Sequence, residues 1–578
     1  MKRRQIKKLV ALVLACAMLS ASLIGCGNKE DSSSTSNEVE TAAPTDDSEI
    51  EAVSEGAFDP RSITEGITLT VAVADNARVA DFNTNKMTLM IEEALGVDLQ
   101  FETYASQDYQ TKLNAMVYSG EKLPDIIFNA SDANISAWAQ EGAVVELSEW
   151  FENRDYAKNL YETQESAGVD VISYMKNADG EIYGFPYYMQ STAQEIWAKM
   201  WVYEPWLEKL GKELPTTTEE YFELCKLACA TDLNGNGKAD EIALTGTKLG
   251  GAHDAWFEYL MTPYVYAFDD RYLVVEDGEL SFAYMTEEWK EGLKYIKRFF
   301  DEGLIPLETL TQSQEQYEAL WYADETVLMS FIYWHMQKGA TDYVLEWTHV
   351  PCLEGPEGVY QAMYKPSVPD TGKTTCITTD CENPLAAFLV CDFMCSEVMS
   401  ISNRYGEQGV NWDYVADLDL NLDEYTYQYD HYKEKYLIKY DDAGFFGGSE
   451  PQNVSYLQSG PYVLSGRAIF ANIVPKEPKT EAEQANTDLA KMKGAAYADC
   501  LANAREEVID FMPMTADEIQ DYSDTVTLIT NYLYEITGQF LTGAKDIDAE
   551  WDGFQAQMKE FGVEQLLETY QVAYDRVH

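Results

Sequence analysis

The first part of the folded chain alternates between apolar strands and amphipathic helices. Residues 66–73 (GITLTVAV) predict a strand, and residues 86–96 (KMTLMIEEALG) show helical spacing that ends at a glycine. Apolar and polar positions alternate strictly over residues 97–104 (VDLQFETY), as in a half-buried strand. Residues 108–120 predict a second helix, and residues 124–130 predict a buried strand. This order predicts an α/β sheet with right-handed crossovers.

Polar residues follow two of these predicted strands. Asp75 and Asn76 come after the first strand, and Asn129, Ser131 and Asp132 come at the end of the third. Ligands of α/β sheets bind outside the carboxyl ends of the strands, so we expect these side chains at the edge of a ligand cleft. The alternative is that they are turn residues, because turns favour the same residue types.

The later part of the chain is rich in helical patterns. Residues 281–303 and 383–400 have helical apolar spacing, and so do residues 548–562 and 563–578 at the end of the chain. The chain has 578 residues, which is more than one hydrophobic core usually organises. We therefore expect two or more lobes, with a helix-rich C-terminal region.

The N-terminus resembles a bacterial export signal. Residues 1–8 are basic, residues 9–25 are apolar, and the sequence LIGC over residues 23–26 matches a lipobox. We predict a signal peptide over residues 1–25 and a diacylglyceryl group on Cys26. Residues 26–65 are rich in Ser, Thr, Glu and Asp and predict a disordered tether. An ordinary secretion signal with a chance cysteine, or an uncleaved anchor, is the alternative.

The charge of the chain excludes two classes of partner. The formal net charge is −58, with 99 acidic and 41 basic residues. Such a surface repels nucleic acid and anionic lipid headgroups. We find no second long apolar stretch, so we expect contact with the membrane only through the N-terminal lipid.

Eight cysteines remain beyond Cys16 and Cys26. They are Cys225, Cys229, Cys352, Cys376, Cys381, Cys391, Cys395 and Cys500. Two pairs are spaced four residues apart in helical stretches, where the geometry is poorly suited to a disulfide. The chain has no CxxC motif, and its five histidines are scattered. We interpret most of these cysteines as small buried hydrophobic residues and do not expect a zinc or redox site.

Residues 231–246 (TDLNGNGKADEIALTG) have the oxygen-rich spacing of a calcium loop. Ala243 stands where an EF-hand has its closing glutamate, but Glu241 can supply that carboxylate. The candidate ligands are Asp232, Asn234, Asn236, the Lys238 carbonyl, Asp240 and Glu241. Three carboxylates and two amides suit calcium better than magnesium. The alternative is an Asx-rich turn without a metal.

The segments around this loop indicate a structural role. Residues 216–230 predict a helix with Thr216 and Glu219 as a capping box, and residues 241–246 predict a strand. The second helix that moves in calcium sensors is therefore missing. The loop also offers no nucleophile or base beyond the ligands themselves, so we expect the metal to stabilise one lobe.

The order of segments resembles extracellular solute-binding proteins of family 1, the lipoprotein components of carbohydrate ABC importers. The matching segments are the lipobox, YQTKLNAMVYSGEKLPDIIF, ISAWAQEGAVVELSEWF, DGEIYGFPYY, PWLEKLGKELPTTTEEY, DLNGNGKADEIALTG, VLMSFIYWH, NPLAAFLVCDFMCSEVMSISNRYGEQGVNW and WDGFQAQMKEFGVEQLLETYQVAYDR. The resemblance runs from about residue 66 to the end. It is to the large Gram-positive members, which are similar to the calcium-containing alginate-binding proteins, and these carry calcium in a matching loop.

The resemblance implies a two-lobed, type II periplasmic-binding-protein-like α/β fold whose hinge closes the lobes on a ligand. It implies an N-terminal lobe of residues 66–183 plus about 365–420, and a C-terminal lobe of residues 184–364 plus about 421–578. The first crossing lies at residues 179–188 and the return near residues 373–379. An ABC permease would receive the ligand at the outer face of the cytoplasmic membrane, and we expect a monomeric protein.

A sugar site needs aromatic rings and polar side chains that bind hydroxyl groups. By position relative to the family segments, the candidates are Asn76, Ser131, Asp132, Tyr187, Tyr188, Gln190, Trp201, Trp256, Trp334, His335 and Trp412. Each aromatic candidate has the alternative of being a core or surface residue. We expect an oligosaccharide receptor without enzymatic activity. A peptide receptor, a surface glycoside hydrolase and an adhesin are the alternatives, although no GxSxG, HExxH or P-loop motif occurs.

Overall fold

The computed structural model describes residues 58–189, 195–196, 198–238, 240–251, 254–268, 271–321, 326–333, 341–365, 368, 370–417, 421–427, 436–438, 450–464 and 473–578. Phe58–His578 forms one compact unit. The predicted signal peptide, Cys26 and the tether up to residue 57 lie outside the described residues.

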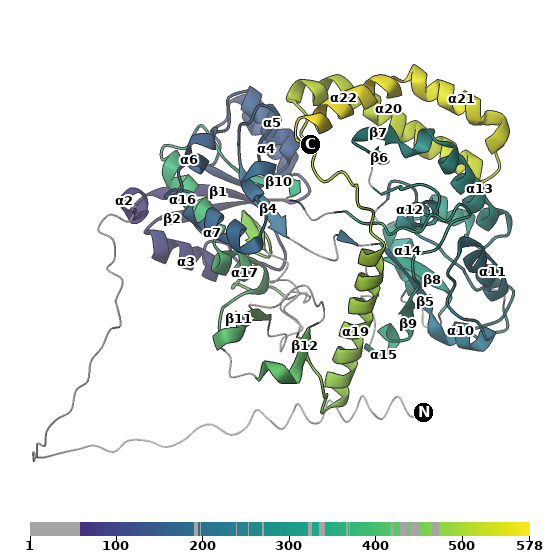
Figure 1. Cartoon of the computed structure of the whole chain (residues 1–578). Coiled ribbons are helices and arrows are strands. Elements are labelled where there is room, and N and C mark those ends of the chain that lie inside the picture. Colours follow the sequence, from purple (N-terminus) through teal and green to yellow (C-terminus); the bar gives the residue numbers. More distant parts are fainter. Residues whose placement is uncertain are drawn as a thin grey trace, which may run out of the picture. The chain divides into compact units, whose positions relative to one another are not determined.

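The strands that the sequence predicts near the N-terminus form the parallel part of a six-stranded sheet (Figure 1). Strand β1 (Thr68–Ala74) pairs in parallel with both β2 (Asp98–Tyr104) and β3 (Ile126–Ala130). The connecting helices are α3 (Lys86–Leu95) and α4 (Tyr109–Ser119), and each ends at a glycine with a left-handed backbone. These predictions from hydrophobic spacing are confirmed.

Three further strands complete the sheet, in the order β14-β4-β10-β3-β1-β2. Strand β10 (Asp370–Ile377) lies antiparallel between β3 and β4 (Phe185–Met189). Strand β14 (Tyr462–Leu464) adds to β4 in parallel. The predicted lobe boundaries differ from this arrangement, since they assigned residues 185–189 and 462–464 to the C-terminal lobe. Sequence pattern predicts that a segment is a strand, but it does not identify the distant strand to which that segment bonds.

The folded body also begins earlier than predicted. Helix α2 (Arg61–Thr64) lies inside the stretch predicted as a tether. Thr64 is fully buried, and its hydroxyl is within hydrogen-bond distance of the carbonyls of Pro60 and Leu95. A single turn of helix without apolar periodicity leaves little trace in the sequence.

Helices cover the six-stranded sheet, and α5 and α16 both contact β10 (Figure 1). Besides α3 and α4, the helices around this sheet are α5 (Asp132–Gln140), α6 (Ser148–Glu152), α7 (Lys158–Ala167), α8 (Val171–Tyr174), α16 (Pro384–Met394) and α17 (Glu397–Tyr405). The core between them contains Phe151, Phe185 and Phe388, with ring centroids 4.9–5.0 Å apart. The buried Asp392 of α16 accepts hydrogen bonds from the backbone of Asn159 and Leu160 at the start of α7. Burial raises the pKa of Asp392 to about 6.

The predicted helix over residues 383–400 is broken into α16 and α17, which are bent by 70°. Among the residues that the structure describes, no single helix is long and apolar enough to cross a membrane. The bent pair α16 and α17 meets that test together, by length and composition only.

A second body surrounds a three-stranded sheet of β8 (Ser330–Tyr333), β5 (Lys199–Tyr203) and β9 (Trp347–His349), with β5 in the middle. Strands β6 (Leu273–Glu276) and β7 (Glu279–Phe282) form a hairpin, and this is why the helix predicted from residue 281 begins only at Glu287. The helices of this second body are α10 (Glu204–Leu210), α11 (Thr218–Cys229), α12 (Ala255–Met261), α13 (Glu287–Asp301), α14 (Gln314–Trp321) and α15 (Thr341–Val344). Turns of 3-10 helix lie at Ala283–Met285 and Leu307–Leu310.

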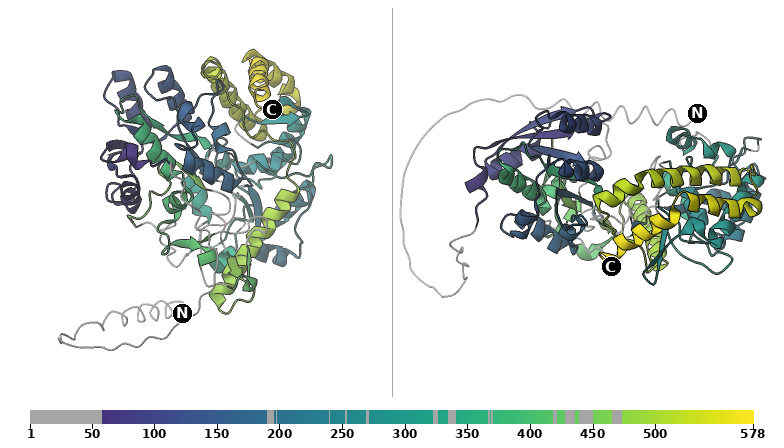
Figure 2. Two further views of the ribbon diagram at one scale, coloured as in Figure 1. Left: turned by 60° about the vertical axis from the view of Figure 1, so that its left-hand side comes forward. Right: turned by 90° about the horizontal axis from the view of Figure 1, so that it is seen from above.

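The C-terminal part of the chain is helical, as predicted. Helices α20 (Ala516–Leu541), α21 (Ile547–Glu560) and α22 (Val563–Asp575) contact one another, and α20 packs on α13 (Figures 1 and 2). The long helix α19 (Glu481–Ala502) precedes them and contacts β9 and α15. One hydrophobic core joins α11, α12, α13 and the last three helices.

Short elements connect the two parts. Strand β11 (Trp412–Tyr414) pairs with β13 (Tyr436–Ile438), and β12 (Tyr425–Tyr427) pairs with β15 (Ile473–Pro475). Turns of 3-10 helix lie at Val415–Asp417 and Leu422–Glu424.

The first testable prediction concerns Gly460. This glycine brings the segment before β14 against the hydrophobic core beside the six-stranded sheet. Its φ is +80°, and a Cβ there would lie 2.7 Å from the Phe128 ring and 2.9 Å from Met394. We expect Gly460→Ala to lower the free energy of unfolding by about 2–4 kcal/mol, because backbone strain and overpacking add. Calorimetric unfolding of residues 27–578 measures this loss of unfolding free energy.

Gly120→Ala is the matched control. Gly120 has a φ of +68°, but a Cβ there meets nothing within 4 Å. Its substitution should cost only the strain of the left-handed backbone, about 1 kcal/mol. Equal losses in the two variants would show that the close approach at Gly460 does not constrain the fold.

Candidate functional site

The predicted calcium loop is folded around Asp232. One oxygen of its carboxylate accepts hydrogen bonds from the backbone N–H groups of Gly235 (2.7 Å) and Asn236 (3.1 Å), and the other accepts from that of Gly237 (2.9 Å). Gly235 and Gly237 have φ values of +76° and +78°. These left-handed conformations allow the chain to wrap around one carboxylate.

Asp240 and Glu241 close the loop from the opposite end. The side-chain amides of Asn234 and Asn236 donate to Asp240 at 3.0–3.2 Å, and these bonds lower the pKa of its carboxyl group. One oxygen of the buried Glu241 accepts from the backbone N–H groups of Leu233 (2.6 Å) and Asn234 (3.2 Å). Its other oxygen is buried without a hydrogen-bond partner.

This orphaned oxygen indicates what the loop can hold. A buried carboxylate oxygen without a donor costs free energy, and a bound cation would remove that cost. Asn234 and Asn236 can turn their amide oxygens toward a cation, because amide orientation follows the local hydrogen bonds. The five predicted side-chain ligands therefore belong to one hydrogen-bonded loop, and their oxygen-rich chemistry fits a hard cation. The Lys238 N–H donates to the Asn236 side chain at 2.8 Å.

Two details around the loop differ from the sequence-based predictions. Thr217, not Thr216, is the N-cap of α11, and its hydroxyl accepts from the N–H of Glu220. The predicted strand after the loop is a single bridge between Ile242 and Leu328. Ala243 is fully buried in the core, so the chain has left the loop before the twelfth position of an EF-hand.

The polar residues at the carboxyl edge of the six-stranded sheet lie in a hydrogen-bond network. The Gln110 side chain donates to the Asn129 carbonyl (2.9 Å) and accepts from the Ser131 N–H (3.2 Å). Asn129 has a φ of +52°, and its side chain accepts from the Gly460 N–H at 2.8 Å. Ser131 is the N-cap of α5, which begins at Asp132. These contacts fix the backbone at the edge, as the turn interpretation predicts.

Asp75 and Asn76 also make local contacts. The exposed Asp75 accepts a hydrogen bond from the Ser106 N–H at 2.5 Å, and its hydrogen bonds with Ser106 lower the pKa of its carboxyl group. Asn76 accepts from the Arg78 N–H at 3.0 Å. Both residues lie directly after β1, where the sequence places them.

Four aromatic residues that we predicted as sugar-binding platforms are core residues. The side chains of Tyr188, Trp201, Trp256 and Trp412 are at most 1% exposed. The three indole N–H groups donate to the backbone carbonyls of Tyr333, Thr247 and Gly406, respectively. A ring enclosed in this way presents no face to a ligand, so these predictions are wrong.

Tyr187 remains partly exposed. Its ring lies against Tyr462, with centroids 4.6 Å apart, and Gln458 donates to its hydroxyl at 3.3 Å. The candidates Gln190, Trp334 and His335 lie outside the described residues.

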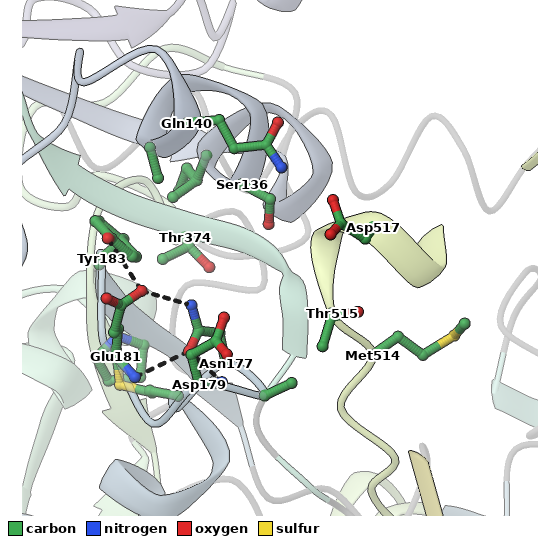
Figure 3. A pocket seen from close by; sticks show the side chains of 16 residues that line it. Ser136, Gln140, Asn177, Asp179, Glu181, Tyr183, Thr374, Met514, Thr515 and Asp517 are labelled. Atoms are coloured by element: carbon green, nitrogen blue, oxygen red, sulfur yellow. Dashed lines mark hydrogen bonds between the residues drawn. The ribbon is translucent and has the colours of Figure 1, made fainter. Parts of the chain in front are cut away.

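A pocket of about 370 Å³ opens where the first crossing segment meets β10 and the start of α20 (Figure 3). Ser136 and Gln140 of α5 lie on one side, and Thr515 and Asp517 of α20 lie on another. The other lining residues are Ile135, Ala139, Met175, Asn177, Ala178, Asp179, Glu181, Tyr183, Gly184, Pro186, Thr374 and Met514.

The pocket is acidic: among the described residues, its lining includes three carboxylates and no basic side chain. Glu181 accepts hydrogen bonds from the Tyr183 hydroxyl (3.1 Å) and the Asn177 amide (3.2 Å). Burial and the hydrogen bond to Glu181 raise the pKa of Tyr183, so its phenol keeps its proton at neutral pH. Asp179 and Asp517 supply two further carboxylates.

The far wall of the pocket is held by contacts that the sequence analysis missed. Thr515 and Glu518 form a capping box at the start of α20. The Arg576 guanidinium donates to the Pro513 carbonyl and to Glu518, each at 2.9 Å. The Tyr174 ring packs edge-on against Phe511, with centroids 5.0 Å apart. The signal in the sequence was the spacing of Thr515 and Glu518, which is typical of a helix start.

Comparison with known proteins places the chain in a family. A family model described as bacterial extracellular solute-binding protein matches residues 77–400. The chain is 24% identical to the fructooligosaccharide ABC transporter substrate-binding protein FusA of Streptococcus pneumoniae, over 86% of this chain and 88% of FusA. It is 26% identical to lipoprotein LipO of Bacillus subtilis over 53% and 52% of the two chains.

Solved structures share the fold. The FusA structure with kestose has a TM-score of 0.67 at 22% identity, covering 88% of this chain and 99% of FusA. An HMO-binding, ABC-transporter-associated solute-binding protein of Bifidobacterium longum infantis has a TM-score of 0.70 at 18% identity, with coverage of 88% and 99%. The alginate-binding protein AlgQ2 without calcium ion has a TM-score of 0.59 at 19% identity, with coverage of 88% and 98%. The fold is therefore the two-lobed α/β fold of these proteins, and the chain belongs to the bacterial extracellular solute-binding protein family.

Proposed function

We propose that this protein is a receptor that captures a neutral oligosaccharide in the pocket beside β10 and delivers it to an ABC permease. The observation that carries the proposal is the lining of the pocket, which offers hydroxyl, amide and carboxylate groups and, in the part of the chain that the structure describes, no basic side chain. Sugar hydroxyls donate well to carboxylates, whereas an acidic glycan would be repelled by Asp179, Glu181 and Asp517.

The position of the pocket suits capture by closure. Gln140 and Glu181 belong to the part of the chain around the six-stranded sheet. Asp517 lies in the first turn of α20, which packs on α13. A ligand that bonds to both sides favours the conformation in which they approach each other. A closed receptor and an open one then differ in the surface that they present to a permease.

The relatives support an oligosaccharide rather than a peptide. FusA is named for fructooligosaccharides, and the Bifidobacterium protein is described as HMO-binding. Both are binding proteins of transporters, which supports a receptor without enzymatic activity. The lipobox at residues 23–26 and the similarity to LipO support a lipid anchor on Cys26 outside the cytoplasmic membrane.

We further propose that the loop from Asp232 to Glu241 binds a structural calcium ion. Asp232, Asn234, Asn236, Asp240 and Glu241 would hold it, together with the Lys238 carbonyl. The ion would neutralise part of the charge of the three carboxylates that this loop carries. The buried oxygen of Glu241 that lacks a partner supports this assignment.

The second prediction tests the pocket. In calorimetric titrations of residues 27–578, we expect saturable binding of kestose or a neutral milk oligosaccharide, and none of polygalacturonate. Asp517→Asn should weaken binding by about tenfold, because a charge-assisted hydrogen bond contributes about 1.5–3 kcal/mol.

Asp524→Asn is the control, since it changes the same charge on the exposed side of α20. Equal effects of the two substitutions would place the ligand elsewhere. Saturable binding of peptides alone would contradict the oligosaccharide assignment, and release of reducing ends would contradict a receptor without activity.

The third prediction tests the calcium loop. Removal of calcium with EDTA should lower Tm by about 2–3 °C, since a ligand at 100 times its Kd adds about 2.7 kcal/mol to the stability of a unit of this size. Glu241→Gln should remove most of this sensitivity, because its amide nitrogen replaces the oxygen that would bind the ion.

The exposed Glu223 of α11 offers the matched control, and Glu223→Gln should leave the response to EDTA unchanged. The double variant Asp232→Ala and Asp240→Ala should melt at the same temperature with and without calcium. A wild-type melting curve that EDTA does not change would rule out the site.

A further inference from the structure

A second cluster of potential metal ligands lies between β9 and the last turn of α19, which contact each other (Figure 1). His349 ends β9, and Asp499 and Cys500 lie near the end of α19. The Nε2 atom of His349 is 3.1 Å from an Asp499 carboxylate oxygen and 3.9 Å from the Cys500 sulfur. One ligand atom from each of the three residues lies within 4.8 Å of the others.

The orientation of the histidine ring suits a metal ligand. The Nδ1 atom of His349 is 3.3 Å from the Met200 carbonyl, which can only accept a hydrogen bond. Nδ1 therefore carries a proton, and Nε2 faces the carboxylate and the thiol. Histidine ligands of metals are typically fixed by such a bond from the other ring nitrogen to a carbonyl or carboxylate.

The cluster is mostly buried. The side chains of His349 and Asp499 are 12% and 30% exposed, respectively, and Cys500 is 3% exposed. Asp499 is therefore its most exposed member, and a bound metal ion would be partly desolvated by the buried sulfur.

We propose that His349, Asp499 and Cys500 form a binding site for a zinc-like transition-metal ion, separate from the oxygen-rich calcium loop. A thiolate, an imidazole and a carboxylate form a donor set typical of Zn²⁺, whereas calcium prefers oxygen ligands alone. On binding, the Cys500 thiol loses its proton to solvent, as does Nε2 of His349 where it is protonated, while Nδ1 keeps its proton toward the Met200 carbonyl. The metal joins β9 to α19 and so fixes α19 to the three-stranded sheet.

The fourth prediction uses Co²⁺ as a spectroscopic substitute for Zn²⁺. Residues 27–578 contain the compact unit Phe58–His578 and exclude Cys16 and Cys26. The reduced protein, freed of transition metals and saturated with calcium, should bind one equivalent of Co²⁺ and develop a thiolate-to-cobalt charge-transfer band. Zn²⁺ should displace the cobalt and remove the band. Saturation with calcium keeps the oxygen-rich loop from contributing to the titration.

Variants separate this site from other thiols. Cys500→Ser should abolish the band, and His349→Asn and Asp499→Asn should each weaken Co²⁺ binding by about tenfold or more. Cys381→Ser is the control, because Cys381 is a buried thiol near the Asp125 carboxylate and lies outside the His349, Asp499 and Cys500 group. It should keep the band at full intensity.

A readout on the wild-type protein guards against variants that fail to fold. X-ray absorption at the zinc edge should show one sulfur ligand together with nitrogen or oxygen ligands. A first shell of oxygen alone, a band that persists in Cys500→Ser, or no band in the reduced wild-type protein would overturn the proposal.

Discussion

The insertion of β10 between β3 and β4 is the constraint on which the rest of the structure depends. This strand returns from the second body and pairs antiparallel on both sides, so the sheet is continuous only when both crossings lie side by side. Gly184, at the first crossing, has no room for a side chain, because a Cβ would lie 2.2 Å from the Thr374 side chain and 2.8 Å from the Thr375 carbonyl. Close backbone contact at this point defines the floor of the acidic pocket.

Much of the fold could be predicted from local pattern. Strict alternation over residues 97–104 and glycine stops at Gly96 and Gly120 correspond to observed strand and helix ends. Pairing with distant strands could not be predicted this way. Strand β14 has three residues, and its place beside β4 depends on the contacts of Gly460 with Phe128 and Met394. Such contacts join residues that are far apart in the sequence, and they leave no periodic signal.

The three candidate sites show the same division. The calcium loop is contiguous, so the spacing of Asp232, Asn234 and Asn236 predicts the cluster directly. The pocket and the metal cluster join residues far apart in sequence. Aromatic composition predicted an ample supply of rings for sugars, yet Trp201 and Trp256 serve the core because large apolar rings contribute most where water is excluded. His349 and Cys500 become partners only because β9 and α19 pack together.

The contact of Arg576 with Pro513 and Glu518 connects the surface of α22 to the wall of the pocket. Substitutions on this last helix can move the start of α20 without altering any group that touches a ligand. Selection for a new ligand can therefore act in two places. One is the set of hydrogen-bonding groups in the pocket, and the other is the contact of Arg576, which positions the start of α20 at the pocket wall. Relatives with equal pocket residues would then differ in affinity, and comparison of the pocket alone would miss the difference.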